Sequence, residues 1–204
     1  MLKSVELVGT AVKLVPLEKM HEQGLYEAAK PKEIWEHLPV KVHSLNDIKQ
    51  LIKSALIAKQ EGRELPFAVF DIESHSIVGS TRFLDISLPN KSVEIGWTWY
   101  HPSVWRTRVN TECKYLLLKY CFEELKLHRV QFKTDVRNNR SRKAIKRLGA
   151  MQEGISRKHM VLPDGYVRDS VIFSIIDDEW PFVKKRLEGF LHAASQGNKE
   201  NVSN

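Results

Sequence analysis

The sequence contains few cysteines and no long apolar run. Its two cysteines, Cys113 and Cys121, fall within one predicted helix, so we do not expect a disulfide framework. No apolar stretch approaches the roughly 20 residues that are needed to cross a bilayer. Residues 1–17 lack the continuous apolar core and the small-residue cleavage site of a signal peptide. These absences favour a cytoplasmic protein that does not enter a membrane.

Metal-binding patterns are also missing. The eight histidines include no pair with the four-residue spacing of a helical metal site, and no cluster of cysteine and histidine has zinc spacing. We therefore predict no metal. Cys113 and Cys121 are about two helical turns apart, so they share a face that we expect to be buried. An acyl-cysteine relay is the less favoured alternative.

The sequence has no internal repeat and no linker long enough to divide it. Its 204 residues suffice for one domain with a sizeable core, and 42% hydrophobic and 28% charged residues are typical of a soluble globular protein. We expect one mixed α+β domain over residues 1–194. The polar stretch "SQGNKENVSN" at 195–204 is expected to be a disordered tail.

Apolar periodicity and turn residues predict an order of helices and strands. Helices are predicted at residues 17–30, 44–62, 109–125, 138–150 and 177–194. Strands are predicted at residues 8–17, 66–72, 76–86, 92–100, 128–136, 152–162 and 166–176.

The turn "HPSVWRTRVN", residues 101–110, joins a predicted strand to a predicted helix and contains no glycine. The first turn of a helix presents unpaired N–H groups and the positive end of the dipole, which together bind phosphates. We expect Asn110 or Thr111 to cap this helix, with Arg106 and Arg108 as additional donors. The alternative is a plain capped helix with two solvated arginines.

Positive charge is concentrated around this turn. Residues 101–150 contain thirteen Lys and Arg against four Asp and Glu, a net charge of +9, whereas the other residues sum to −2. This local field indicates an anionic ligand, although a solvated basic helix face is a common alternative.

The run from "VEIGWTWYHP" through "VNTECKYLLLKYCFEEL" to "RVQFKTDVRNNRSRKAIKRLGA" resembles the GNAT superfamily of acyl-CoA-dependent N-acetyltransferases. Within it, the likeness is to the RimJ and RimL branch of ribosomal-protein N-terminal acetyltransferases. The branch signature is present at Asn138, Ser141, Leu148 and Gly149. The resemblance covers residues 8–178 in element order and implies a mostly antiparallel sheet of about six to seven strands flanked by helices.

The phosphate loop departs from this family. The family pattern is Gln/Arg-x-x-Gly-x-Gly/Ala, and residues 105–110 occupy those positions. Trp105 therefore replaces the usual Gln or Arg, and Arg108 replaces the central glycine. Because Arg108 cannot readily adopt a positive φ, we expect the loop to stay close to helix geometry.

The resemblance also implies how the acyl donor is held. The backbone of "GWTWY" would pair with the pantetheine arm, amides of the following turn would hold the pyrophosphate, and the helix after Asn138 would lie near the other end of coenzyme A. The donor-binding residues implied in this way are Trp97, Thr98, Trp99, Arg106, Thr107, Arg108, Val109, Asn110, Thr111, Asn138 and Lys143. Arg142, Lys146 and Arg147 are alternatives to Lys143 in the basic helix.

The implied catalytic residues are Glu94 as general base and Ser141 as the acid that protonates the thiolate. Alternation along the strand predicts Glu94, Gly96, Thr98 and Tyr100 on one face, opposite Val93, Ile95, Trp97 and Trp99. Trp35, Glu94 and Tyr100 are expected to face the acceptor amine. The plainer alternatives are a strand carboxylate for Glu94, a first-turn helix serine for Ser141 and a packing residue for Trp35.

The function predicted from these features is transfer of an acetyl group from acetyl-CoA to a primary amine. A protein N-terminal α-amine is favoured slightly over a small molecule, because its pKa near 8 lies below the roughly 10.4 of a lysine. A non-catalytic acyl-CoA sensor is one alternative. A nucleic-acid-binding module is another, motivated by the pI of about 9.4, but no recognisable motif supports it. We expect neither nucleic acid nor membrane as a partner, and homo-oligomerisation is left open.

Overall fold

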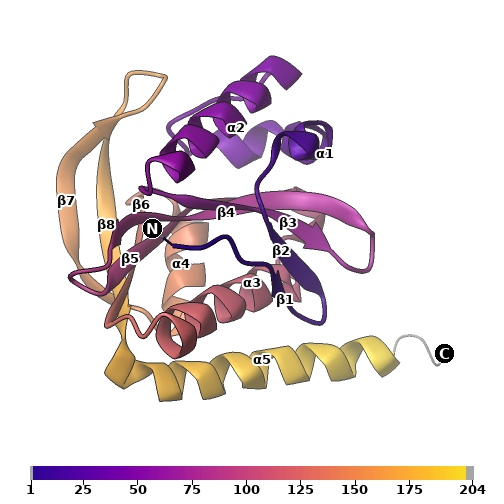
Figure 1. Ribbon diagram of the computed structural model, residues 1–204, viewed down its shortest axis with the longest axis vertical. Helices are drawn as coiled ribbons and strands as arrows, with labels where there is room; N and C mark the ends of the chain where they lie inside the picture. The colour runs from indigo at the N-terminus through magenta and orange to yellow at the C-terminus, as the bar shows by residue number, and fades with distance from the viewer. Residues whose placement is uncertain (1, 201–204) are drawn as a thin grey trace.

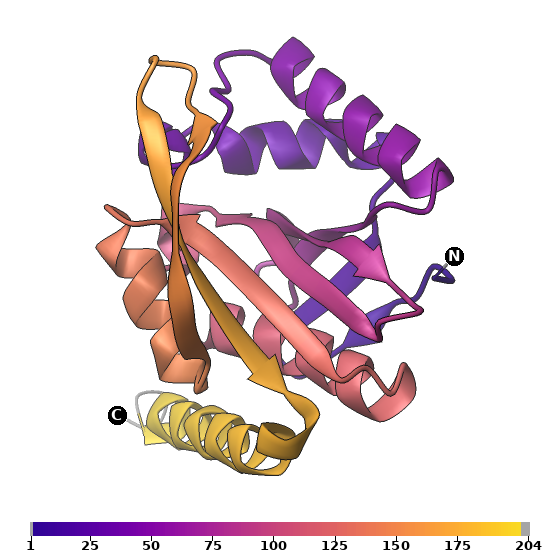
Figure 2. The ribbon, with the colours of Figure 1, turned by 90° about the vertical axis from the view of Figure 1, so that its left-hand side faces the viewer.

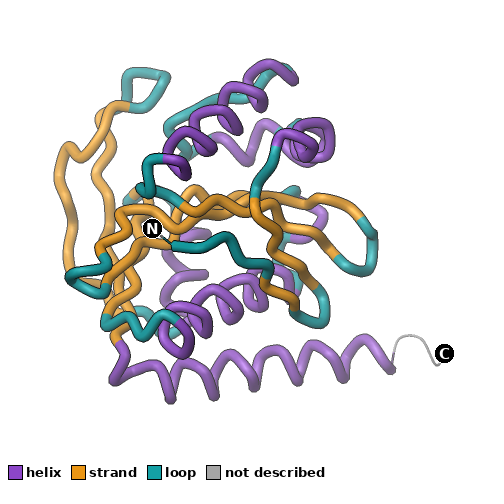
Figure 3. The backbone as a smooth tube through the Cα atoms, in the orientation of Figure 1, coloured by secondary structure: helices purple, strands orange, loops and turns teal. Residues whose placement is uncertain are grey.

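An eight-stranded sheet lies between two layers of helices (Figure 1). The computed structural model describes residues 2–200. The first two helices cover one face of the sheet, and the three later helices cover the other, as the tube in Figure 3 shows. The α+β class expected from the sequence is confirmed.

The strands are β1 (Leu7–Val8), β2 (Val12–Pro16), β3 (Leu65–Asp71), β4 (Ser76–Ser87), β5 (Ser92–Tyr100), β6 (Arg129–Asp135), β7 (Met151–Val161) and β8 (Val167–Ile176). The α-helices are α1 (Glu22–Ala29), α2 (Leu45–Gln60), α3 (Arg108–Lys119), α4 (Asn139–Leu148) and α5 (Trp180–Glu200). A π-helical turn at Tyr120–Glu124 extends α3. None of the helices within residues 2–200 is long and apolar enough to cross a membrane.

The ends of α2 and α4 follow the predicted capping signals. Ser44 accepts a hydrogen bond from the N–H of Asp47 at the start of α2. Asn138 does the same for Ser141 at the start of α4, and Gly149 ends that helix with a φ of 112°. Helix α5 continues through residues 195–200, which were expected in a tail, and residues 201–204 lie outside the described part.

The strands follow the order β1-β2-β3-β4-β5-β6-β8-β7. Neighbours are antiparallel except for the parallel pair β5 and β6. Residues 8–17 were predicted as a single strand, but a tight turn divides this region into β1 and β2. This division is why the sheet has eight strands rather than six to seven. The β7–β8 hairpin extends past the sheet toward the layer of α1 and α2 (Figure 2).

The parallel pair separates soon after it begins. Only the first three residues of β5 pair with β6, ending at Glu94 opposite Gln131. Farther along β5, Trp97 has a φ of 50°, and the register with β4 shifts between Ser80 and Arg82. This β-bulge bends β5 and places an extra residue in the strand. The two strands therefore diverge toward their carboxyl ends.

The bulge also corrects the predicted faces of β5. Val93 and Ile95 belong to the core beneath the sheet, but Trp99 packs in the opposite core with α1 and α2. Tyr100 lies in the same core as Ile95, although alternation had placed them on different faces. The extra residue at the bulge reverses the alternation from that point onward.

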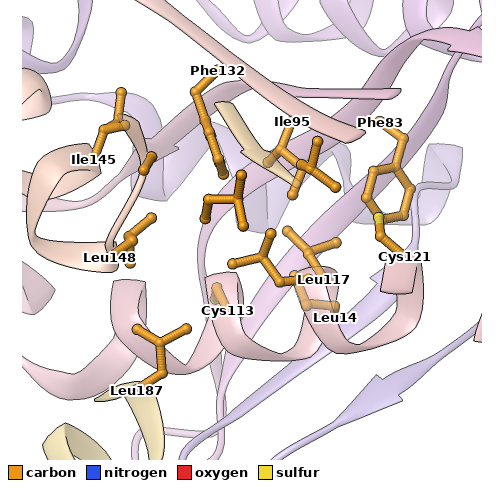
Figure 4. Packing of buried hydrophobic residues seen from close by; sticks show 14 of the residues in the cluster. Leu14, Phe83, Ile95, Cys113, Leu117, Cys121, Phe132, Ile145, Leu148 and Leu187 are labelled. Carbon is orange, nitrogen blue, oxygen red and sulfur yellow. The ribbon is translucent and has the colours of Figure 1, made fainter. Parts of the chain in front are cut away.

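The larger core fills the space between the sheet and α3, α4 and α5 (Figure 4). Cys113 and Cys121 are free and fully buried in it, as expected, beside Leu117 and Phe83. The smaller core lies between the sheet and α1 and α2. Two cores on opposite faces hold the diverging strands between rigid layers.

Glu112 connects α3 to the turn between β1 and β2. Its Oε1 accepts hydrogen bonds from the backbone N–H and hydroxyl of Thr10, at 2.7 and 2.8 Å. Its Oε2 accepts from the N–H groups of Ala11 and Val12, at 2.7 and 3.0 Å. A Cβ on Gly9 would lie 2.6 Å from the Glu112 carboxyl carbon, so only glycine leaves room for this contact. Backbone donors thus neutralise a buried carboxylate without a cation.

We predict that Glu112→Gln lowers the free energy of unfolding by about 2–3 kcal/mol, because an amide cannot accept four hydrogen bonds and loses the charge that strengthens them. Urea denaturation measures the change. Glu124→Gln, at an exposed position near the end of the same helical segment, is the control and should change stability by less than about 0.5 kcal/mol. Equal stability of the two variants would contradict the assigned role of Glu112.

Candidate active site

The divergence of β5 and β6 opens toward two helix N-termini. Both strands run in the same direction, so their carboxyl ends lie at the same edge of the sheet. Helix α3 follows β5 after a short loop, and α4 follows β6. Unpaired N–H groups and the positive ends of two dipoles therefore meet at the open end, an arrangement suited to an anionic ligand.

Helix α3 begins earlier than the sequence suggested. Its cap is Thr107, whose Oγ1 accepts from the N–H of Val109 at 3.3 Å, so the expected caps Asn110 and Thr111 lie inside the helix. Arg108 is the first helical residue and has an ordinary φ, as expected. The positive φ of 63° occurs instead at Arg106. The loop thus obtains its sharp bend without glycine.

A groove of about 1080 Å³ lies at this helix N-terminus. Arg106, Arg108 and Arg147 line it with Thr107, Val109 and Thr111, and the acidic residues Glu27, Asp71 and Glu73 also belong to its lining. Arg147 donates to Thr111 Oγ1 at 3.1 Å and lies 4.2 Å from the ring centre of Phe190. Neither Arg106 nor Arg108 has an ion-pair partner among the described residues. These free guanidinium groups beside free helix amides fit the phosphates of coenzyme A.

Six of the predicted donor-binding residues do not line this groove: Trp97, Thr98, Trp99, Asn110, Asn138 and Lys143. Asn110 lies inside the first turn of α3, and Lys143 is exposed on α4. Of the basic residues on α4, Arg147 lines the groove, whereas Arg142 donates to the carbonyl of Val136 in the preceding turn. The side chain of Asn138 is used for capping α4.

Trp105 bridges the two sides of the open end. Its indole N–H donates to the carbonyl of Tyr100 at 2.9 Å, which fixes the ring beside the end of β5. The guanidinium of Arg140, from the first turn of α4, lies 3.5 Å from the ring centre. This cation–π contact joins the loop before α3 to α4. The residue that departs from the family pattern therefore ties together the two helix N-termini.

Glu94 lies at the closed end of the divergence. It is 5% exposed, and its Oε2 lies 2.8 Å from Lys133 Nζ and 3.1 Å from Gln131 Nε2. Burial opposes the charge on Lys133, but its hydrogen bonds and proximity to Glu94 and Asp85 together raise the Lys133 pKa above its ordinary value. Glu94 is therefore a buried, paired carboxylate rather than an exposed strand residue.

The other oxygen of Glu94 lies beside Gly96. A Cβ on Gly96 would lie 3.1 Å from Glu94 Oε1 and 2.9 Å from Leu84. Within residues 2–200, Oε1 has no hydrogen-bond donor. The carboxylate thus has one oxygen fixed by Lys133 and one oxygen available to a ligand or water.

Ser141 lies at the opposite end of the divergence from Glu94. It is half-buried in the first turn of α4, where its N–H donates to Asn138 Oδ1 at 2.9 Å. Strand β6 runs from Gln131, opposite Glu94, to Asp135 before the turn into α4, a length of about 13 Å. The two predicted catalytic residues therefore flank the divergence from its two ends.

A second set of polar side chains lies along β6 and β8, on the same face of the sheet as Glu94. The buried carboxylate of Asp135 accepts from Arg137, and the backbone of Arg137 also donates to it. Burial raises the pKa of Asp135, but these hydrogen bonds outweigh it and hold the pKa below the ordinary value. Arg168 donates to Ser170 and to the carbonyl of His37, which joins β8 to the loop after Trp35.

Two residues expected to contact the acceptor are packing residues instead. Trp35 is 1% exposed, its ring centre lies 5.3 Å from that of Trp99, and its indole N–H donates to the carbonyl of Ala29. Tyr100 is buried in the larger core. Neither side chain faces open space. Trp97 and Thr98 are half-buried beside the bulge, where their backbone borders the divergence.

Sequence reasoning missed Lys114 and Lys133. Lys114 is a buried lysine on α3 whose Nζ donates to Thr98 Oγ1 at 2.7 Å. A signal was present in "NTECKYLLL", because Glu112 and Lys114 stand two apart in an otherwise apolar helix and cannot pair across one face. The pairing of Lys133 with Glu94 depends on strand register, which the sequence pattern does not give.

Comparisons with known proteins agree with this geometry. Residues 12–151 match the family model described as "Acetyltransferase (GNAT) domain". The crystal structure of a putative acetyltransferase from T. thermophilus has a TM-score of 0.84 and 33% identity, covering 94% of this chain and 99% of that chain. The "Putative ribosomal N-acetyltransferase YdaF" of Bacillus subtilis (strain 168) is 30% identical over 105 residues, which are 52% of this chain and 56% of YdaF.

A structure of Mycobacterium smegmatis RimJ in complex with CoA-disulfide shares the fold, with a TM-score of 0.76 and 21% identity over 91% of this chain and 93% of that chain. The family model alone spans more than half of the sequence. Membership of this family accounts for the match to the family model, for the divergent parallel strands and for the basic helix N-terminus. The chain belongs to the GNAT family and is an acyl-CoA-dependent N-acetyltransferase.

Proposed function

We propose that the protein acetylates the α-amine of a protein N-terminus, with acetyl-CoA bound between β5 and β6. The observation that carries the donor placement is the divergence of these strands after Glu94 and Gln131. Backbone groups of β5 beyond Glu94 lack a strand partner on this side, so an extended arm with amide groups can pair with them. The phosphates would then reach the amides and arginines at the start of α3.

Arg108 is proposed to contact a phosphate directly. It replaces the family glycine, has an ordinary φ and lines the groove, so its side chain rather than a close backbone approach would supply the donors. The N–H groups of Thr107 and Val109 already donate to the carbonyl of Val104 and to Thr107 Oγ1, so the contact is assigned to the Arg108 side chain. The altered loop is thus proposed to retain donor binding by exchanging a backbone contact for a charged side chain.

We predict that Arg108→Gln weakens acetyl-CoA binding by about 1–3 kcal/mol, the usual range for a lost charged hydrogen bond. Calorimetry on the purified protein measures the dissociation constant, and rising salt should reduce the difference between variant and wild type. Lys143→Gln removes an exposed charge outside the groove and should leave the affinity unchanged. Wild-type affinity in Arg108→Gln would refute a phosphate contact.

Glu94 is proposed to act as the general base through its Oε1. The incoming ammonium must lose a proton before its nitrogen attacks the thioester carbonyl. Lys133 holds Oε2, and Oε1, which lies beside Gly96 and has no donor among the described residues, would take this proton through a bridging water. The lysine thus orients the base.

Ser141 is proposed to complete the reaction at the sulfur. Collapse of the tetrahedral intermediate breaks the carbon–sulfur bond, and the departing thiolate needs a proton. The hydroxyl of Ser141 lies on the first turn of α4, at the open end where the donor enters. The helix N-terminus nearby also favours the negative charge that develops on sulfur.

We predict that Glu94→Gln lowers kcat by about 10²-fold at neutral pH, with a smaller loss at higher pH, where more of the acceptor is already a free amine. Ser141→Ala should lower kcat with little change in acetyl-CoA affinity. Steady-state rates from about pH 6 to 10 on a confirmed acceptor separate the two effects. If both variants retain wild-type rates, binding and orientation alone carry the catalysis.

The α-amine acceptor is favoured by two arguments. An α-amine, with a pKa near 8, is deprotonated at lower cost than a lysine side chain at neutral pH. In addition, the relative YdaF bears the name of a ribosomal N-acetyltransferase. The face around Glu94 is lined by backbone and polar side chains from β6, β8 and the loop after Trp35, which suits an extended peptide.

We predict that peptides with a free N-terminus are acetylated faster than the same peptides with a blocked N-terminus and an internal lysine. Mass spectrometry of the products locates the acetyl group, and thiol release gives the rate. A polyamine and an aminoglycoside serve as the small-molecule comparison. Turnover of either small molecule, with no acetylation of the peptides, would reverse the assignment of the acceptor.

A further inference from the structure

Lys114 projects from α3 into the space between the diverging strands. It is 5% exposed, and its Nζ lies 2.7 Å from Thr98 Oγ1 on β5 and 6.0 Å from the ring centre of Phe132 on β6. Thr98 and Phe132 both follow the last paired residues of their strands. The ammonium is therefore under the part of the sheet where the backbone of β5 and β6 has separated.

The ammonium has few partners for a buried charge. Among the described residues, no carboxylate pairs with Lys114, and Thr98 accepts one of its three N–H donors. On the same helix, Glu112 is engaged with the β1–β2 turn. Cys113, with a pKa raised by burial to about 12, is neutral at working pH.

The strands supply no opposite charge either. On β5, burial raises the pKa of Tyr100 well above its ordinary value, so this phenol is neutral. Glu94 and Lys133 lie on the other face of the sheet and pair with each other. Burial accordingly lowers the pKa of Lys114 to about 8.

A buried lysine without a carboxylate is costly when it gains only one bond to a hydroxyl and a cation–π contact at 6.0 Å. A methionine or leucine at this position would extend the apolar face of Cys113 and Leu117 without that cost. The charge is therefore explained better by a ligand with acceptor oxygens than by packing. The space between the strands is also where the arm of the acyl donor is proposed to lie, and that arm carries two amide carbonyls and the thioester carbonyl.

We propose that Lys114 is a donor-binding residue, whose ammonium hydrogen-bonds a carbonyl oxygen of the pantetheine–thioester arm between β5 and β6. This inference rests on the proposed placement of acetyl-CoA. Thr98 holds the ammonium in position, because its Oγ1 also lies 2.8 Å from Thr81 Oγ1 in β4. Lys114 would thus contact the acyl donor from the face of the sheet that α3 covers. The acceptor is proposed to bind on the opposite face.

Proton linkage provides the test. A carbonyl contact favours the charged form of Lys114 and raises its pKa in the complex, so binding at about pH 8 should take up about half a proton. Affinity should be constant below about pH 7 and fall as the pH rises through about 8. Titration calorimetry with acetyl-CoA, in two buffers of different ionisation enthalpy, measures the uptake without an acceptor present. The phosphates of the ligand are fully ionised at this pH.

Two variants distinguish ligand contact from a structural role. Lys114→Met should bind acetyl-CoA about 10- to 100-fold more weakly and take up no proton. Lys114→Arg keeps a donor and a charge but does not titrate, so it should retain most of the affinity and also lose the proton uptake. It also keeps the bond to Thr98, which protects the fold if the methionine variant is unstable.

The outcomes separate this inference from the proposed function. If wild-type protein does not bind acetyl-CoA, the donor placement itself is wrong. If the wild type binds without proton uptake and Lys114→Met binds equally well, Lys114 is a structural residue and the inference fails. Proton uptake that persists unchanged in Lys114→Arg would likewise assign the titrating group elsewhere.

Discussion

Beyond Glu94, β5 and β6 do not form hydrogen bonds with each other. This separation of the two strands determines the arrangement of the site. Buried backbone N–H and C=O groups need partners, and a strand that loses its neighbour inside a sheet must find another. The bulge at Trp97 creates this situation by bending β5 away from β6. Because the pair is parallel, the following helices α3 and α4 both begin at the open end. The same geometry is the reason for the proposal that the extended arm of acetyl-CoA lies between the strands and its phosphates lie at the start of α3.

The buried charges of Glu112, Glu94 and Lys114 are each compensated differently. Backbone amides satisfy Glu112, which fixes α3 against the β1–β2 turn. Lys133 pairs with Glu94 on the acceptor side. In the described part of the chain, Lys114 has a hydroxyl and the distant ring of Phe132 as partners, but no carboxylate. The charges of Glu112 and Glu94 are compensated by groups of the protein itself, whereas no carboxylate compensates Lys114 in the described part of the chain. This difference is the reason for the proposal that Lys114 contacts the ligand.

Local signals in the sequence predicted the parts of the fold that local signals control. The caps Ser44 and Asn138 and the ending at Gly149 placed α2 and α4 within a few residues. The faces of β5 were wrong after Ile95, because alternation assumes a regular strand and the bulge at Trp97 depends on its neighbours. The burial of Trp35 and Tyr100 in the two cores could not be predicted from the sequence for a related reason. An aromatic residue contacts substrate or core according to the tertiary arrangement, and both lie in the core.

The phosphate loop shows how the function of a glycine can be divided among other residues. Glycine in such a loop combines a positive φ with close backbone approach. Here Arg106 takes the positive φ, at a cost of order 1–3 kcal/mol for a residue with a side chain, and Arg108 begins the helix. Trp105 offsets this strain by bonding to Tyr100 and stacking against Arg140 of α4. The loop is thereby fixed to both sides of the opening, so its helix amides are in position before a ligand arrives. The bend of this loop therefore rests on Arg106 and Trp105 rather than on a glycine, and the N-terminus of α3 keeps an ordinary helix geometry.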